Sequence, residues 1–84
     1  SFSGQVETSV YPNPSAGTFF MEIKTDFSNH YEVKVVNLIG QTIKQERVES
    51  NVVHKIDLNQ VPKGVYFLQV DTGAEQVIKR LIVR

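Results

Sequence analysis

Residues 65–70 read Val-Tyr-Phe-Leu-Gln-Val, and this stretch is the most apolar of the extended segments in the chain. Branched and aromatic residues suit a pleated sheet and lose side-chain freedom in a helix. In an extended strand Tyr66, Leu68 and Val70 face the same way. The short length and the alternation predict a β-strand with one buried face.

Six further segments have a similar extended character and are separated by turn residues. No window keeps a 3.6-residue apolar period over three turns, so no helix is expected. Seven short strands usually pack as two layers, which predicts an all-β, Ig-like antiparallel β-sandwich. The chain lacks the Cys pair and Trp of antibody domains, so the likeness concerns architecture only. The predicted strands are Val6–Val10, Thr18–Ile23, Tyr31–Val35, Thr42–Val48, Val52–Leu58, Val65–Val70 and Gln76–Arg84.

The alternation also predicts which side chains fill the interior. Segment 42–48 is mostly polar, so we expect it to face water or to lie at a sheet edge. We expect Gly40 and Gly64 to adopt positive φ beside the strands they adjoin. The predicted inward rows are Phe19, Met21 and Ile23; Tyr31, Val33 and Val35; His54, Ile56 and Leu58; and Tyr66, Leu68 and Val70.

Length and composition exclude several classes of protein. Eighty-four residues predict a single domain, 1–84, with residues 1–9 serving in part as a linker. Nine basic and nine acidic residues give a formal net charge of +0, which argues against general binding to nucleic acid or anionic membranes. The absence of cysteine excludes disulfides, thiolate zinc sites and a cysteine nucleophile. The start at Ser1, without Met or a signal peptide, indicates a segment of a longer precursor.

Catalytic and metal-binding patterns are not evident. The chain has only two histidines, and His54 and Asp57 would point to opposite faces of a strand. We therefore expect His54 to be a half-buried sheet residue and His30 a solvated loop residue. Asp26, Asp57 and Asp71 are too scattered for a calcium loop, and no Gly-rich phosphate loop exists. The sequence predicts no enzymatic activity, no cofactor and no metal.

Exposed aromatic residues leave one binding function open. Phe19 and Phe20 are adjacent, so one of the two faces away from the interior of a strand. Phe2, Phe27 and Tyr11 fall in or near loops. These rings either cover the open ends of a small sandwich or form a sugar-binding platform. The alternative function is therefore a small accessory carbohydrate-binding or adhesion module of an extracellular enzyme; a structural spacer is a third alternative.

The final segment, Lys79-Arg80-Leu81-Ile82-Val83-Arg84, is basic, then apolar, then basic. In a strand Leu81 and Val83 share one face, with Arg80, Ile82 and Arg84 on the other. Such a segment either closes the sandwich as an edge strand or presents a surface to a partner. A terminal edge strand can also fray or add to the sheet of another protein.

Four groups of residues, taken in order, resemble the C-terminal sorting domains of the type IX secretion system of Bacteroidetes-type bacteria. The resemblance covers nearly the whole chain from Val10 onward. Arg80 stands where a second Lys is common, and Arg84 extends past the usual end. The groups are Tyr11-Pro12-Asn13-Pro14-Ser15 with Gly17 and Phe19; Val36-Asn37, Gly40-Gln41 and Ile43; Ile56-Asp57-Leu58, Pro62 and Gly64-Val65-Tyr66; and Lys79-Arg80-Leu81-Ile82-Val83.

The resemblance implies a non-enzymatic secretion signal attached to an N-terminal cargo protein. The implied partners are the outer-membrane translocon and the sortase machinery, and the implied route runs through the periplasm to the cell surface or the medium. In many members of the family a sortase removes the domain on export. We expect the machinery to recognise Lys79, Arg80, Leu81, Ile82, Val83 and Arg84. We expect structural roles for the motif residues Tyr11, Pro12, Asn13, Pro14, Gly17, Asn37, Gly40, Gln41, Gly64 and Tyr66.

Overall fold

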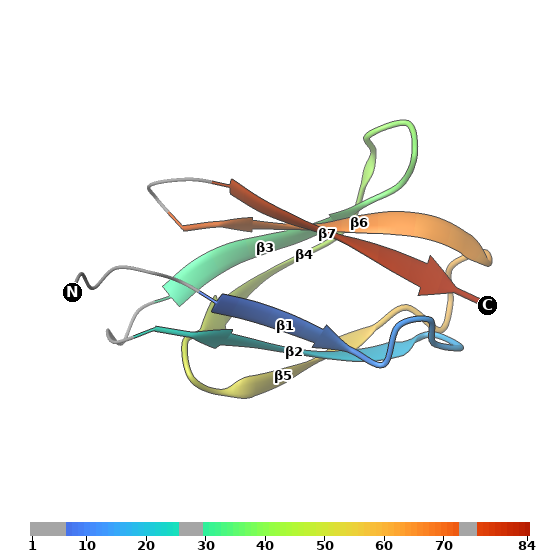
Figure 1. Cartoon of the computed structure of the whole chain (residues 1–84). Helices are drawn as coiled ribbons and strands as arrows, with labels where there is room; N and C mark the ends of the chain where they lie inside the picture. Colours follow the sequence, from blue (N-terminus) through green and yellow to red (C-terminus); the bar gives the residue numbers. More distant parts are fainter. Residues whose placement is uncertain (1–6, 26–29, 73–75) are drawn as a thin grey trace.

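The computed structural model describes residues 7–25, 30–72 and 76–84, and this part of the chain forms seven strands in two stacked sheets (Figure 1). One sheet has the order β1-β2-β5 and the other β4-β3-β6-β7, with antiparallel pairing throughout. The all-β, two-layer prediction is confirmed. The strands are β1 (Glu7–Tyr11), β2 (Thr18–Lys24), β3 (His30–Val36), β4 (Thr42–Glu49), β5 (Val53–Asp57), β6 (Gly64–Asp71) and β7 (Gln76–Val83).

Several strand ends differ from the sequence-based bounds by one or two residues. Tyr11 pairs with Phe20 and so belongs to β1, which ends where Pro12 has no N–H to give to the ladder. His30 was expected in a loop but pairs with Glu49 as the first residue of β3, where it is exposed. Asp71 was expected to open a hairpin turn but pairs with Gln76 as the end of β6; the rest of that predicted turn reaches outside the described residues.

The interior lies between the two sheets and contains the predicted apolar rows. Phe19, Met21 and Leu68 are each 0% exposed, and Tyr66 is 6% exposed. His54 is half-buried, as expected. Burial of each large apolar side chain contributes about 1.5–3 kcal/mol, so these rows provide most of the driving force for folding. The cluster comprises Phe19, Met21, Ile23, Tyr31, Val33, Val35, Val48, Ile56, Leu58, Tyr66, Leu68, Val70, Leu81 and Val83.

The larger sheet has β4 and β7 as its two edge strands. The edge position of β4 agrees with its polar sequence, since charged side chains discourage an edge from pairing with other chains. Asn37 fixes the β3–β4 hairpin: its side-chain oxygen accepts hydrogen bonds from the N–H groups of Ile39 (3.1 Å) and Gln41 (2.9 Å). Gly40 lies in this hairpin with φ 86°, as predicted.

Tyr66 is both buried and hydrogen-bonded, since its hydroxyl donates to the Pro62 carbonyl at 2.5 Å. We expect Tyr66→Ala to lower the free energy of unfolding by about 3 kcal/mol through the cavity it leaves. Tyr66→Phe should cost about 1 kcal/mol, because it removes only the hydrogen bond. Chemical denaturation measures both values. The exposed control Val53→Thr should change stability little, and a Tyr66→Ala effect no larger than the control would contradict the assignment.

Gly17 and Gly64 form a matched pair with positive φ, at 146° and 152°. A Cβ on Gly17 would lie 2.9 Å from the Cα of Asn59, whereas a Cβ on Gly64 would meet no atom within 4 Å. Both Ala substitutions incur backbone strain of about 1–3 kcal/mol, but only Gly17→Ala adds a clash with backbone. We therefore expect Gly17→Ala to lower the melting midpoint more than Gly64→Ala. Equal shifts would show that the structure around Asn59 accommodates the added methyl group without a loss of stability.

Candidate recognition site at the C-terminal strand

Residues 79–83 of the predicted recognition segment lie in β7 and Arg84 directly follows it; the side chains divide between two environments. Leu81 and Val83 are 0% and 4% exposed and belong to the interior cluster. Ile82 is half-buried and Arg80 is exposed on the opposite, outer face of the sheet. One half of the segment therefore holds the fold together, and the other half faces outward.

The two adjacent cations, Lys79 and Arg80, do not form a single positively charged site. Lys79 and Arg80 are neighbours in β7, so their side chains leave the strand on opposite faces. Lys79 points to the same side as Leu81, yet it is exposed because β7 is an edge strand. Of these two cations, only Arg80 shares the outer face with Ile82.

The outer edge of β7 is paired with the connection between β1 and β2, which runs beside the end of β7 (Figure 1). The Asn13 side-chain amide donates to the Arg80 carbonyl at 2.6 Å and accepts from the Ile82 N–H at 3.0 Å. Ser15 N–H donates to the Ile82 carbonyl at 3.0 Å, and Arg84 N–H donates to the Ser15 carbonyl at 2.9 Å. We call residues 13–15 the edge clamp.

The edge clamp works because an asparagine side chain carries the same donor and acceptor as a peptide group. Pro12 and Pro14 have no N–H, so the side chain of Asn13 supplies the bonds that the backbone here cannot. Ser15 forms a parallel bridge with Val83, is 7% exposed, and donates from its hydroxyl to the Thr18 carbonyl at 2.6 Å. The terminal segment is therefore held on both sides, and an added strand would have to displace the edge clamp before it could pair with β7.

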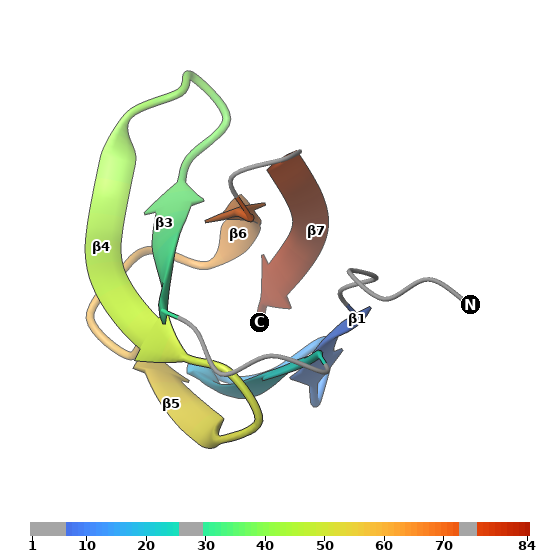
Figure 2. The ribbon, with the colours of Figure 1, turned by 90° about the vertical axis from the view of Figure 1, so that its left-hand side faces the viewer.

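Most of the motif segments lie at one end of the sandwich. The 12–17 connection, the loop before Gly64 and the C-terminus are at the end opposite to the start of β1 (Figure 1), whereas the 37–41 hairpin projects away from them (Figure 2). Asn37, Gly40 and Gln41 build that hairpin, while Tyr66 holds the loop that leads to β6 through Pro62. The pairing of Asn13 with β7 could not be predicted from the sequence, because no local pattern indicates a contact between residues 67 positions apart.

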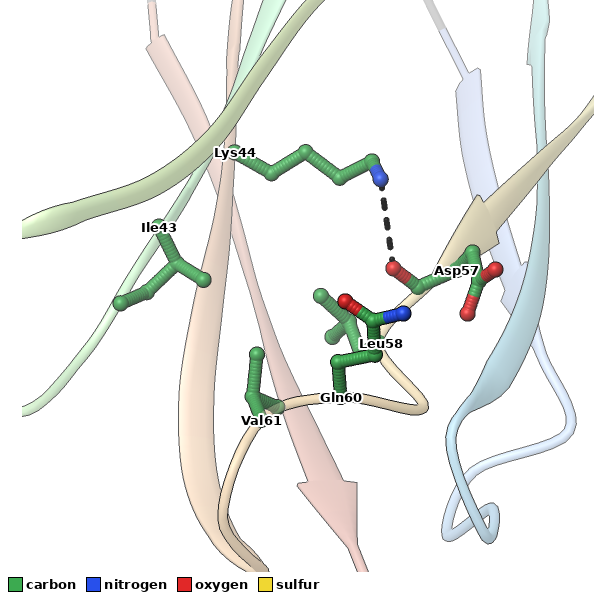
Figure 3. Close-up of a pocket in the computed structure, with 6 residues that line it drawn as sticks. All are labelled: Ile43, Lys44, Asp57, Leu58, Gln60 and Val61. Atoms are coloured by element: carbon green, nitrogen blue, oxygen red, sulfur yellow. Dashed lines mark hydrogen bonds between the residues drawn. The ribbon is translucent and has the colours of Figure 1, made fainter.

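A hollow of about 230 Å³ lies between β4 and the loop after β5 (Figure 3). Lys44 spans it and donates from Nζ to the Asp57 carbonyl at 3.3 Å, which links the two sheets along this side. The other lining residues, Ile43, Leu58, Gln60 and Val61, have apolar or amide side chains. Both ionisable residues of the lining, Lys44 and Asp57, make structural contacts: Lys44 also forms an ion pair with Glu46, and the Asp57 carboxylate bonds to Asn59.

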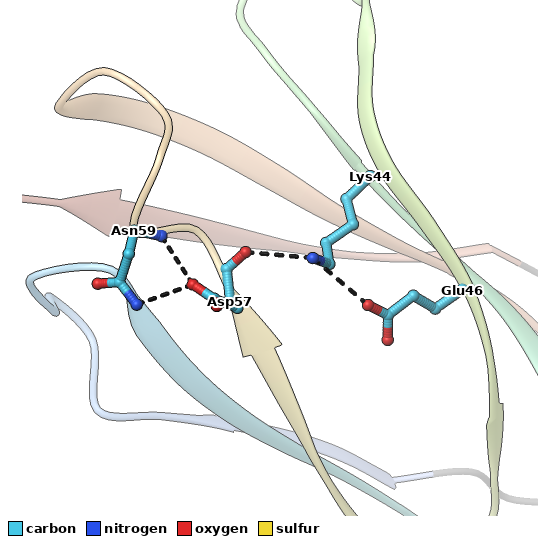
Figure 4. Close-up of polar contacts among 4 residues, drawn as sticks. All are labelled: Lys44, Glu46, Asp57 and Asn59. Atoms are coloured by element: carbon cyan, nitrogen blue, oxygen red, sulfur yellow. Dashed lines mark hydrogen bonds and ion pairs between the residues drawn. The ribbon is translucent and has the colours of Figure 1, made fainter.

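The carboxylate of Asp57 has a structural role (Figure 4). It accepts hydrogen bonds from the backbone N–H of Asn59 at 2.9 Å and from the Asn59 side-chain amide at 2.8 Å. These bonds hold the pKa of Asp57 below its ordinary value, and the positive charges of Lys44 and Lys55 act in the same direction. Asp57 is thus an ionised cap of the loop that follows β5.

Other kinds of site receive little support from the described residues. No group of three or more His, Asp or Glu side chains among them could hold a metal ion. Within the same residues, no helix is long and apolar enough to cross a bilayer.

The aromatic residues do not build a flat platform in the described part of the chain. The rings of Tyr11 and Phe20 are tilted by 31°, with centroids 6.2 Å apart, and only Tyr11 is largely exposed. Phe2 and Phe27 lie outside the described residues. Tyr11 and Phe20 pair across β1 and β2, so they serve as cross-strand neighbours in the smaller sheet.

The edge clamp predicts a specific change in amide hydrogen exchange. Asn13→Ala removes the acceptor of the Ile82 N–H, so this amide should exchange faster, while the Leu81 and Val83 amides, which face β6, should keep their protection. Val53→Thr, an exposed change on the smaller sheet, is the control and should leave the exchange of all three amides unchanged. Exchange measured by NMR provides the readout. An unchanged Ile82 rate in Asn13→Ala would show that the clamp does not form.

Comparison with known proteins shows the family of the chain. Residues 9–84 match the family model described as "Secretion system C-terminal sorting domain". The chain is similar to an endo-acting ulvan lyase of Formosa agariphila, with 30% identity over 76 residues. That match covers 89% of this chain and 14% of the lyase, so the chain spans only a small part of its relative. The chain belongs to the family of C-terminal sorting domains of the type IX secretion system.

Proposed function

We propose that this domain is a non-enzymatic label that directs an N-terminal cargo protein across the outer membrane through the type IX translocon. The family match over residues 9–84 is the observation that supports this function. The ulvan lyase supports the idea of a small label on a larger protein, since the matching segment is 14% of its length. The cargo would cross the periplasm and reach the cell surface or the medium.

We further propose that the machinery recognises the outward side chains of the 79–84 segment on the folded domain. The alternation of burial along β7 supports this: Leu81 and Val83 are enclosed, while Arg80, Ile82 and Arg84 remain accessible. Leu81 and Val83 would then contribute indirectly, by holding the strand in place. Removal of the domain by a sortase, with attachment or release of the cargo, would follow recognition.

The experiment that tests this proposal changes outward side chains of β7 and leaves the interior intact. Deletion of residues 79–84 would also remove Leu81 and Val83 and unfold the sandwich, so it cannot separate recognition from folding. The variants are Arg80→Glu and Ile82→Ser in a fusion of a reporter to the domain. Each should reduce export about tenfold or more, because a reversed charge or a lost apolar contact exceeds the 1.4 kcal/mol that a factor of ten represents.

The matched control is Lys55→Glu, which reverses an exposed charge on the smaller sheet. It should leave export unchanged. Thermal unfolding of each fusion checks that the domain is folded. Normal export of both β7 variants would refute recognition of this face, and an equal loss in the control would show a general effect of charge.

A further inference from the structure

The outer face of β6 and β7 carries an apolar surface that surrounds Arg80. The register places Val65 opposite Ile82 and Phe67 opposite Arg80. Val65, Phe67 and Ile82 are half-buried although they point away from the interior, and Arg80 is exposed. We call these four residues the outer patch; Phe67 and Val65 belong to none of the functional predictions made from the sequence.

The outer patch is supported by neighbouring strands on both sides of β6. Phe67 also pairs with Val36 of β3, on its other side. Val36 does not belong to the interior cluster, yet only 7% of its surface is exposed. Neighbouring residues therefore bury it on the outer face of the sheet. Phe67 therefore has cross-strand neighbours on both flanks and presents a preformed apolar surface.

Arg80 is a cation without an acidic partner among the described residues. The ion pairs of this part of the chain join Lys44 to Glu46 and Arg47 to Glu32. Asp71, the acidic residue of β6 on this face, is four positions along the strand from Phe67. A surface complementary to the patch would thus carry a carboxylate next to apolar side chains.

The edge clamp limits how a partner can bind to β7. The backbone groups of Arg80, Ile82 and Arg84 that would accept an added strand already bond to Asn13 and Ser15. A second copy of the chain is a poor occupant, because face-to-face contact would bring Arg80 against Arg80. A partner can therefore dock on the face of the sheet while the clamp remains closed.

We propose that the outer patch is the docking surface for a component of the secretion machinery that carries a carboxylate beside an apolar area, and that it docks without strand addition. This inference rests on the proposed function. It extends the recognised surface from β7 to β6, and it specifies the chemistry of the partner.

The test uses the reporter fusion with substitutions in β6. Phe67→Thr should reduce export about tenfold, since a central aromatic contact commonly contributes more than one factor of ten to binding. Val65→Thr keeps the shape of the side chain, so it should reduce export while leaving the melting midpoint nearly unchanged. This second variant keeps the test decisive if Phe67→Thr fails to fold. The matched control is Val53→Thr on the smaller sheet, which is 49% exposed and should export normally.

A second arm tests whether the clamp stays closed. Ser15 and Val83 are bridge partners, so Ser15→Cys with Val83→Cys can form a disulfide that locks the clamp in the oxidising periplasm. The locked fusion should be exported as well as the Val83→Cys single variant. Loss of export specific to the locked form would overturn face-on docking in favour of strand addition.

The outcomes separate this inference from the proposed function. If fusions with Phe67→Thr and Val65→Thr are exported normally while the Arg80→Glu fusion is not, docking on the outer patch is refuted. Recognition of the outward side chains of β7 then stands. If all of these variants export normally, the outer patch and the recognition of the β7 face both fail, while the export function of the domain stands. If the unaltered fusion is not exported, the proposed function itself fails. Sedimentation of the chain should show a monomer, and a dimer that Phe67→Thr dissociates would assign the patch to self-association and overturn the inference.

Discussion

The hydrogen bonds between residues 13–15 and the outer edge of β7 connect the two sheets of this sandwich. Apolar contacts alone would let two small layers slide, because such contacts have no preferred direction. The clamp adds directional bonds: Asn13 and Ser15 lie between β1 and β2 of one sheet and bond to the last strand of the other. β7 consequently has partners on both sides where it supplies Leu81 and Val83 to the interior.

Asparagine side chains also stabilise several other connections between strands through hydrogen bonds. Asn37 closes the β3–β4 hairpin, and Asn59 caps the loop after β5 through Asp57. Asn51, at φ 62°, links the turn after β4 to the end of β2 by bonds with Thr25 in both directions. Asparagine tolerates this left-handed conformation and bonds to nearby backbone, which suits a chain without cysteine whose loops need other constraints.

Alternation of apolar and polar residues was sufficient to predict the strands and the interior. A side chain at every second position points inward, so rows such as Phe19, Met21 and Ile23 could be assigned without knowing which strands are neighbours. Strand order, edge position and the clamp depend on contacts between distant residues, and Asn13 gives no local sign of its partner Ile82. The resemblance to a sorting domain identified the family, whereas the outward position of Phe67 next to Arg80 emerged only from the register of β6 and β7.

The location of the proposed signal in a paired strand makes recognition depend on folding. Phe67 and Arg80 come together only when β6 and β7 pair in the observed register, and a slip of one residue would turn Arg80 inward and Leu81 outward. Leu81 and Val83 prevent that slip because the interior accepts their side chains and excludes a charge. A partner that docks on the outer patch would therefore bind the folded label in preference to an unfolded one. The same six residues can serve as both the closing strand and the signal, since each role uses a different face.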